Sequence, residues 1–187
     1  SANLLAVYSL IASKRLRNNK IIIPSLCWIT SISPCIQFGL TPILCDVNMD
    51  DLSIDIDLLE LKIQKEDPSC LFLVSILGLV PNMNRIESLC KKYNILLVVD
   101  NCESQGSTYN NKSLESFGLM STCSSYYGHV TGTIEGGMIV TDDEELYYML
   151  NMLRSHGWSR DIDKRIETEL RLKWGISDFI SRYTFYQ

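Results

Sequence analysis

The sequence predicts an α/β fold in which a mainly parallel β-sheet is layered with helices. Short apolar segments alternate with longer amphipathic segments over the first hundred residues, and this alternation is typical of repeated strand–helix units. Polar or turn-forming residues end the apolar segments, as at Pro24 and Asp100. Because ligands of such sheets collect at the carboxyl ends of the strands, the residues just after the strands are the candidates for a site.

Six apolar segments are expected to form the strands. Ile95–Val99 is the clearest, because all of its residues are apolar and Asp100 follows directly. A loop rich in Gly and Thr separates the last two segments. The expected strands are Ile21–Pro24, Pro42–Asp46, Cys70–Ile76, Ile95–Val99, Met120–Tyr127 and Gly137–Val140.

Composition, periodicity and end signals predict the helices. In Asn84–Tyr93 the apolar residues recur at i, i+3, i+4 and i+7 from Ile86, and Asn94 suits the left-handed residue that ends a helix. Thr141–Glu144 has the pattern of a capping box, which would begin a helix that Gly157 ends. The other segments with helical character are Ala2–Arg17, Ser33–Phe38 and the amphipathic Asp55–Gln64.

The composition is that of a soluble globular protein, with 187 residues, 46% hydrophobic and 21% charged. The net charge is −5 and the 17 Lys and Arg are spread along the chain, so nucleic acid is not expected as a partner. The longest apolar runs are too short to cross a membrane. The seven cysteines include no C-x-x-C pair. We therefore expect no metal framework, and reduced thiols in the cytoplasm.

Both ends of the sequence are expected to be truncated. Ser1 opens directly into helix-forming residues, and Gln187 closes an aromatic run. Residues 1–187 are expected to form one domain, with no linker and no internal repeat.

Asp100 and His129 are the first candidates for chemistry. Asp100 ends a buried strand, where a carboxylate is costly unless it has a partner; it either serves a site or caps a nearby turn. His129 follows another expected strand, in a loop, and loops at strand exits carry many catalytic groups. The alternative is an ordinary loop histidine. The second histidine, His156, precedes Gly157, where it could simply interact with the dipole of a helix C-terminus.

Trp28 and Ser124 are weaker candidates. Trp28 follows the strand Ile21–Pro24 and either stacks on a planar ligand or packs in the core; from its position alone, the core is favoured. Ser124 lies in a strand, where phosphate binding and an ordinary strand hydroxyl both remain open.

Several stretches, taken together and in order, resemble the DegT/DnrJ/EryC1/StrS family of sugar aminotransferases and dehydratases. They correspond to its early strand–helix–strand, the strand ending in its pyridine-binding Asp, its cofactor-lysine loop and the following helix end. These stretches are Ile21–Trp28 with Gly39–Val47, Val99–Gly106, Ser124–Gly137 and Leu153–Gly157. The resemblance covers almost the whole chain. It implies a three-layer sandwich, the large domain of fold-type I enzymes that use pyridoxal 5′-phosphate, without the small C-terminal domain.

The resemblance also implies roles toward the cofactor ring. Asp100 would pair with the protonated pyridine nitrogen, which lets the ring act as an electron sink. Trp28 would stack on the ring face, and Glu103 matches a position, often Gln in the family, that contacts the 3-hydroxyl. For the phosphate, Ser124 matches a hydroxyl that binds it. Ser1 and Ala2 would bind it through backbone N–H groups where the first helix begins.

His129 departs from the aminotransferases of the family, which carry a lysine there that forms an internal aldimine. Imidazole cannot form this Schiff base, so the cofactor would be held non-covalently, with pyridoxamine 5′-phosphate as the resting form. The C-3 dehydratases of 3,6-dideoxysugar biosynthesis form a branch of the family with His at this point. Tyr126–His129, Glu135–Met138 and His156–Arg160 resemble the branch that acts on GDP-4-keto-6-deoxymannose. Val130 departs from it, since a second His is expected there.

The implied reaction is removal of the C-3 hydroxyl from a nucleotide-linked 4-keto-6-deoxysugar, as in the synthesis of lipopolysaccharide sugars. The amine of pyridoxamine phosphate would condense with the C-4 ketone, and His129 would remove the proton from the C4′ carbon of the cofactor. Glutamate would restore the amine, and the enzyme is expected to be a homodimer. An aminotransferase with a displaced lysine is the runner-up, although no lysine lies between Lys112 and Lys164. A non-catalytic member should lack Asp100 or Trp28.

Overall fold

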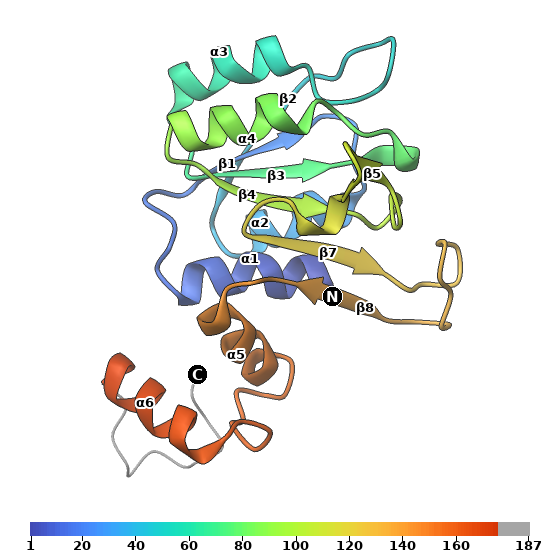
Figure 1. Ribbon diagram of the computed structural model, residues 1–187. Coiled ribbons are helices and arrows are strands. Elements are labelled where there is room, and N and C mark those ends of the chain that lie inside the picture. Colours follow the sequence, from blue (N-terminus) through green and yellow to red (C-terminus); the bar gives the residue numbers. More distant parts are fainter. Residues whose placement is uncertain (176–187) are drawn as a thin grey trace. The chain divides into compact units, whose positions relative to one another are not determined.

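A six-stranded β-sheet organises the first of the two units into which the chain divides, Ser1–Asp142 and Asp143–Gln187. The computed structural model describes residues 1–175 (Figure 1), so the aromatic run that ends at Gln187 lies outside the described residues. In spatial order the strands are β2 (Thr41–Cys45), β1 (Lys20–Pro24), β3 (Cys70–Val74), β4 (Leu96–Asp100), β7 (Met120–Ser124) and β8 (Gly137–Val140). Neighbouring strands are parallel except β7 and β8, which are antiparallel. The predicted α/β fold with a mainly parallel sheet is confirmed.

Helices cover both faces of this sheet (Figure 1). On one face lie α1 (Ala2–Ala12) and α2 (Ile29–Gln37), and on the other lie α3 (Ile56–Glu66) and α4 (Met83–Lys92). Side chains alternate across a strand, so the apolar segments supply two cores. In β1, for example, Ile22 belongs to the cluster that includes Leu59 of α3 and Ile86 of α4, whereas Ile21 and Ile23 face the opposite side and are equally buried.

The second unit contains α5 (Glu144–Leu153) and α6 (Lys164–Trp174). Met152 and Leu170 form a small core of their own. The nearly buried guanidinium of Arg171 pairs with Glu167 at 3.0 Å, one turn earlier on α6. Across the described helices of both units, none has the length and hydrophobicity to span a membrane.

The ends of several elements differ from the prediction. The first helix ends at Ala12 rather than Arg17, because Lys14 adopts a left-handed conformation with φ 56°. The second helix begins at Ile29, four residues before Ser33. The third strand ends at Val74, and a 3₁₀ turn, η1 (Ile76–Gly78), follows it.

The prediction that Thr141 caps the next helix is wrong. Asp143 is the N-cap of α5, and its carboxylate accepts the N–H of Leu146 at 2.9 Å. The Thr141 hydroxyl instead donates to the carbonyl of Leu119 at 2.8 Å. The helix ends at Leu153, before Gly157, whose N–H returns to a carbonyl of its last turn.

A small hairpin between β4 and β7 was not predicted. It consists of β5 (Thr108–Tyr109) and β6 (Lys112–Ser113), and a 3₁₀ turn, η2 (Leu114–Ser116), follows it. Asn110 and Asn111 connect the two strands with φ values of 50° and 59°. Two left-handed residues in succession define the type I′ turn that suits a tight hairpin, and Asn tolerates that conformation.

Candidate functional site

The predicted site residues lie where strands of the sheet end. Because β1, β3, β4 and β7 are parallel, their carboxyl ends share one edge of the sheet. Trp28 follows β1, Asp100 ends β4 with Glu103 shortly after it, and Ser124 ends β7. His129 lies in the loop between β7 and β8. We call this edge the carboxyl edge.

The start of α1 also lies at the carboxyl edge, beside β8. A Cβ added to Gly137 would lie 3.3 Å from the Cβ of Ala2 and 2.9 Å from the carbonyl oxygen of Cys123. Gly137 is in turn the partner of Ser124 in the β7–β8 register. The structure therefore brings Ser1, Ala2 and Ser124 together, and glycine is needed at position 137 because any side chain would collide there.

This corner of the edge offers hydrogen-bond donors to an anion. The first N–H groups of a helix have no partner within the helix and carry its positive dipole. At the start of α1 the Ser1 side chain makes no capping bond, and the first turn has no acidic residue. The Ser124 hydroxyl accepts the N–H of Tyr126 at 3.2 Å, so its proton is free to be donated. These groups suit a phosphate.

Asp100 is buried, with 3% of its surface exposed, and is held by neutral donors. Its Oδ2 atom accepts hydrogen bonds from Asn3 Nδ2 at 2.8 Å and from Ser31 Oγ at 2.9 Å. Its Oδ1 atom accepts the backbone N–H of Cys102 at 3.1 Å. Sequence reasoning missed Asn3 and Ser31 as partners of Asp100, since only the packing of α1 and α2 against one face of the sheet brings them to it.

The thiols around Asp100 are held in the protonated form. Burial, and then the charge of Asp100, raise the pKa values of Cys27 and Cys102. Burial is also the main cause that raises the pKa of Cys123 to about 11. Thiols with such pKa values are poor nucleophiles near neutral pH, so none of the three is a candidate for covalent catalysis.

His129 is carried on a loop that is closed at its base. The Ser125 N–H donates to the Gly136 carbonyl at 3.0 Å, and the Thr133 N–H donates to the Ser125 carbonyl at 2.7 Å. Within the loop the His129 N–H donates to the Tyr126 carbonyl at 3.0 Å, and the two rings meet edge-on with their centroids 6.1 Å apart. The half-buried imidazole is thus carried on a loop whose conformation is fixed by local contacts.

Glu103 and Trp28 occupy the loops after β4 and β1. The Glu103 carboxylate accepts the backbone N–H of Leu77 at 2.9 Å and so connects the loops that follow β3 and β4. Trp28 is the N-cap of α2, and its side chain is 69% exposed. The reading of Trp28 as a core residue is therefore wrong, and its ring is available to stack on a ligand.

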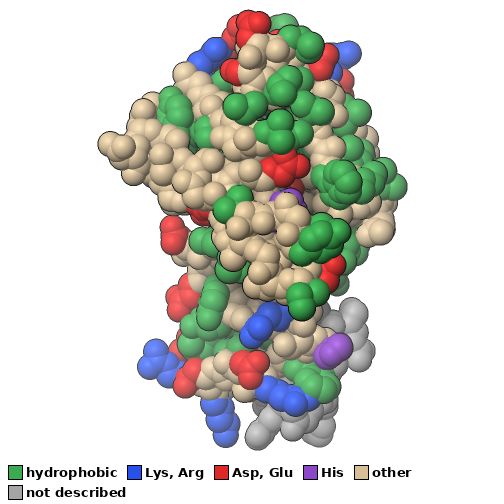
Figure 2. Space-filling model, turned by 90° about the vertical axis from the view of Figure 1, so that its right-hand side faces the viewer, with side chains coloured by type: hydrophobic (Ala, Val, Ile, Leu, Met, Phe, Trp, Pro, Cys, Tyr) green, Lys and Arg blue, Asp and Glu red, His purple; other side chains and the backbone are tan. Residues whose placement is uncertain are grey.

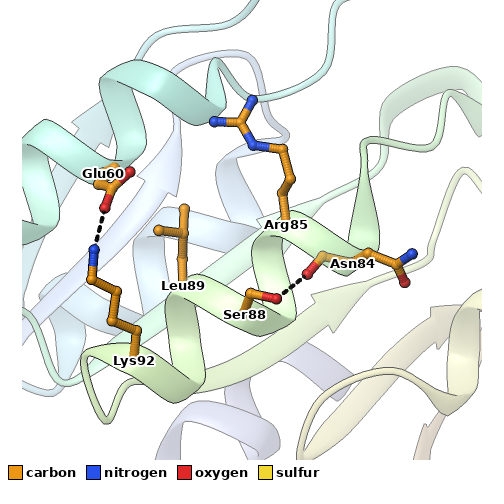
Figure 3. Close-up of a pocket in the computed structure, with 6 residues that line it drawn as sticks. All are labelled: Glu60, Asn84, Arg85, Ser88, Leu89 and Lys92. Carbon is orange, nitrogen blue, oxygen red and sulfur yellow. Dashed lines mark hydrogen bonds and ion pairs between the residues drawn. The ribbon is translucent and has the colours of Figure 1, made fainter.

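A surface cavity of about 370 Å³ lies elsewhere, between α3 and α4 (Figure 3). Its charged side chains are already paired, Lys92 with Glu60 at 2.8 Å and Arg85 with Asp57 at 2.5 Å. None of the predicted site residues lines it. We assign this cavity no role.

The donor set of the carboxyl edge fits a planar phosphorylated pyridine. The start of α1 with Ser124 suits the phosphate, the buried Asp100 suits a protonated ring nitrogen, and the exposed Trp28 suits the ring face. Within residues 1–175, no group of His, Cys, Asp and Glu side chains is arranged to hold a metal ion.

Several known proteins are similar to this chain in sequence and in structure. GDP-4-keto-6-deoxy-D-mannose 3-dehydratase of Escherichia coli O55:H7 is 40% identical over 168 residues, which cover 88% of this chain and 43% of that protein. A structure of the E. coli enzyme with bound hydrated PLP is 42% identical, with a TM-score of 0.80, over 87% of this chain and 42% of that one. A structure of such a dehydratase with a trapped PLP-glutamate geminal diamine is 40% identical, with a TM-score of 0.77, over 87% and 43%.

This chain thus spans less than half the length of these relatives. The family model for the DegT/DnrJ/EryC1/StrS aminotransferases matches residues 1–179. The resemblance seen in the sequence is confirmed, and the chain belongs to the DegT/DnrJ/EryC1/StrS aminotransferase family.

Proposed function

We propose that the protein containing this chain removes the C-3 hydroxyl from a nucleotide-linked 4-keto-6-deoxysugar, with GDP-4-keto-6-deoxymannose as its substrate. The main support for this proposal is His129. It stands in the loop between β7 and β8, and no lysine occurs between Lys112 and Lys164. The relatives with 40% and 36% identity to this chain are dehydratases of that sugar.

The residues of the carboxyl edge would hold pyridoxal or pyridoxamine 5′-phosphate. The cofactor supplies an amine that can be exchanged with the sugar ketone and a ring that withdraws electrons. Ser1, Ala2 and Ser124 would bind the phosphate, Asp100 would keep the ring nitrogen protonated, and Trp28 would cover one face of the ring. Glu103, whose Oε2 atom accepts the N–H of Leu77, would contact the 3-hydroxyl.

His129 acts as the general base. A nitrogen of its imidazole takes up the proton whose removal starts the elimination, and a base at this place does not compete for the carbonyl group as a lysine amine would. The loop bonds described above hold the backbone that carries the imidazole, which limits the entropy cost of aligning the ring. Glutamate is the proposed amino donor, because a similar enzyme has been crystallised with a PLP–glutamate adduct.

We further propose that the active form is a cytoplasmic homodimer. For the first unit, Figure 2 looks onto the side toward which the parallel strands of Figure 1 point, and hydrophobic side chains of that unit gather there. Trp28, Leu77, Tyr127, Val130 and Ile134 are each 69–81% exposed. A second copy that covers part of this apolar surface would offset the cost of exposing it. All seven cysteines are free thiols, as a reducing compartment favours.

The proposed reaction is tested by a single-turnover assay with pyridoxamine phosphate and the GDP- or CDP-linked 4-keto-6-deoxysugar. We expect His129→Asn to keep the cofactor but to lose rate by about 10²–10⁴-fold. His156→Asn, at the only other histidine, is the matched control and should retain the rate. Undiminished turnover in His129→Asn, or an amino sugar as the product, would remove the dehydratase assignment.

A further inference from the structure

The carboxylate of Asp100 is buried without a cationic partner. Among the ion pairs of residues 1–175, none includes Asp100. A buried carboxylate costs several kcal/mol unless charge or hydrogen bonds compensate it. Here the compensation comes from neutral donors, the Asn3 amide, the Ser31 hydroxyl and the Cys102 N–H. Among the described residues, the carboxylate is therefore held by three neutral donors and has no cation paired with it.

The donors are unevenly shared between the two oxygens. Oδ2 receives both Asn3 and Ser31, so its two lone pairs are engaged, whereas Oδ1 receives the N–H of Cys102. The Cys102 thiol also interacts with the carboxylate, but a thiol is a weak donor. Oδ1 is thus the oxygen with capacity for a further strong N–H donor.

Asp100 and Thr122 together hold the Asn3 amide in one orientation. Asn3 is 4% exposed in the first turn of α1, and its Oδ1 atom accepts the Thr122 hydroxyl at 2.7 Å. A carboxylate only accepts hydrogen bonds, so the NH₂ group of Asn3 must face Asp100, 97 residues away in the sequence. The Thr122 hydroxyl, which can donate or accept, then donates to the amide oxygen and holds the amide in this orientation.

A purely structural reading is that the network only satisfies buried polar atoms of the core. Buried polar atoms are not all satisfied in this part of the fold, however. The Nδ2 atom of Asn101, the residue next to Asp100, and the Oγ atom of Ser75 are buried without a hydrogen-bond partner. Three donors converge on Asp100, whereas the NH₂ group of the adjacent Asn101 has no partner. This difference indicates that the network serves to hold the Asp100 carboxylate in a defined position.

We propose that Asn3 is a positioning residue, held in place by Thr122, that fixes the Asp100 carboxylate so that its Oδ1 atom receives the ring N–H of the cofactor. This inference rests on the proposed use of a pyridoxal cofactor, but not on dehydration as the reaction. Asn3 and Thr122 act through Asp100 and touch no reacting atom. Because Thr122 acts mainly through its bond to Asn3, and also contacts the Cys102 thiol, its contribution should become smaller when Asn3 is replaced.

The test compares Asn3→Leu, Thr122→Val and the double variant with the unchanged protein. Two quantities are measured, the dissociation constant of pyridoxal phosphate and the ¹⁵N chemical shift of bound cofactor labelled at the ring nitrogen. Asn3→Leu should weaken binding by about 10- to 100-fold, as expected for a lost hydrogen bond to a charged group. It should also move the ¹⁵N shift toward that of the unprotonated ring. Thr122→Val should change both quantities in the same direction as Asn3→Leu does. Thr122→Ser, which keeps the hydroxyl, should leave both quantities close to those of the unchanged protein.

The double variant is the sharpest measurement, because residues in one network have non-additive effects. Asn3→Leu with Thr122→Val should weaken cofactor binding by less than the sum of the two single losses. Ser9→Ala is the matched control, since Ser9 is a fully buried polar residue of the same helix whose hydroxyl donates to Ala6; it should change neither quantity. Additive losses, or an unchanged ¹⁵N shift in Asn3→Leu, would overturn the proposal even if the protein binds the cofactor. A wild-type protein that binds no pyridoxal phosphate would overturn the proposed function as well.

Discussion

The backbone N–H of Leu77 donates a hydrogen bond of 2.9 Å to the Oε2 atom of Glu103. Leu77 adopts φ 53° and ψ 22°, a left-handed conformation that costs a residue with a side chain roughly 1–2 kcal/mol. Its side chain is 70% exposed, so burial does not offset this cost. The bond that Leu77 donates to Glu103 is a side-chain contact that helps to hold the loop after β3 in this conformation.

Replacement of either residue should therefore change the stability of the cofactor-free protein. Leu77→Gly should raise the free energy of unfolding by about 0.5–1 kcal/mol. Glycine adopts positive φ without strain, and this stabilisation of the folded state exceeds the stabilisation of the unfolded chain by the greater backbone entropy of glycine. Glu103→Ala should lower it by about 1 kcal/mol. Glu103→Gln is the control, since its amide oxygen still accepts the Leu77 N–H. Urea unfolding measures all three, and equal values for Ala and Gln at position 103 would contradict the assigned role.

The absence of a lysine in the loop of His129 predicts how the cofactor is attached. Wild-type protein incubated with pyridoxal phosphate and then with borohydride should release the cofactor on denaturation, because imidazole cannot hold it covalently. His129→Lys should retain it on the peptide that contains residue 129, as mass spectrometry would detect, and should lose the dehydration activity with the base. His156→Lys is the control for surface lysines. Covalent cofactor on the wild-type chain would show that another lysine reaches the site.

Gly118 should tolerate no side chain. Its φ is +75°, and an added Cβ would lie 2.5 Å from the carbonyl oxygen of Leu97, which also accepts the N–H of Leu119 at 2.8 Å. Gly118→Ala should destabilise the protein by about 2–4 kcal/mol, from strain and overpacking together. Gly106→Ala is the matched control, because Gly106 has φ +85° but open space around its Cβ position; it should cost about 1 kcal/mol. Equal losses in thermal or urea unfolding would show that the close approach to Leu97 is unimportant.

The pKa of Cys123, raised to about 11 mainly by burial, predicts slow alkylation. At pH 8 only a fraction on the order of 10⁻³ of this thiol is ionised, roughly a hundredfold less than for an ordinary cysteine. Since raising the pH removes the thiol proton, the rate should still increase about tenfold per pH unit between pH 8 and pH 10. Peptide mapping after iodoacetamide treatment follows this rate, with Cys123→Ser to identify the peptide. A rate that levels off near pH 8.5 would mean that the thiol has an ordinary pKa.

The sequence was most informative where one local property decides the structure. The apolar run Ile95–Val99 marked β4 to within one residue, Leu96–Asp100, because a strand buried on both faces must be apolar throughout. Asn94 was correctly identified as left-handed, with φ 52°. The ends of helices were harder to predict, because neighbouring residues compete for the cap position. Thr141 and Asp143 can both cap a helix, and only the bond from Thr141 to Leu119 leaves the role to Asp143.

The site could be predicted in part for the same reason. In a parallel sheet the residue after each strand lies at the carboxyl edge whatever the rest of the fold does, and by this rule Asp100, Trp28 and His129 were expected at that edge, where the structure places them. It could not identify Asn3 or Ser31, which reach Asp100 from two helices whose packing no local pattern encodes. The hairpin at Asn110 and Asn111 did carry a signal, since two consecutive Asn favour a tight turn.

The hydrogen bond between Thr122 and Asn3 joins residues 119 positions apart. Contacts of such high sequence separation form late in folding, because a long loop must close before they contribute. During synthesis at 5–20 residues per second, roughly 6–24 s separate the appearance of these two residues. For that time the segment of the first helix is present without the strand whose Thr122 holds its Asn3. The Asn3 amide therefore reaches its final orientation only after β7 has joined the sheet.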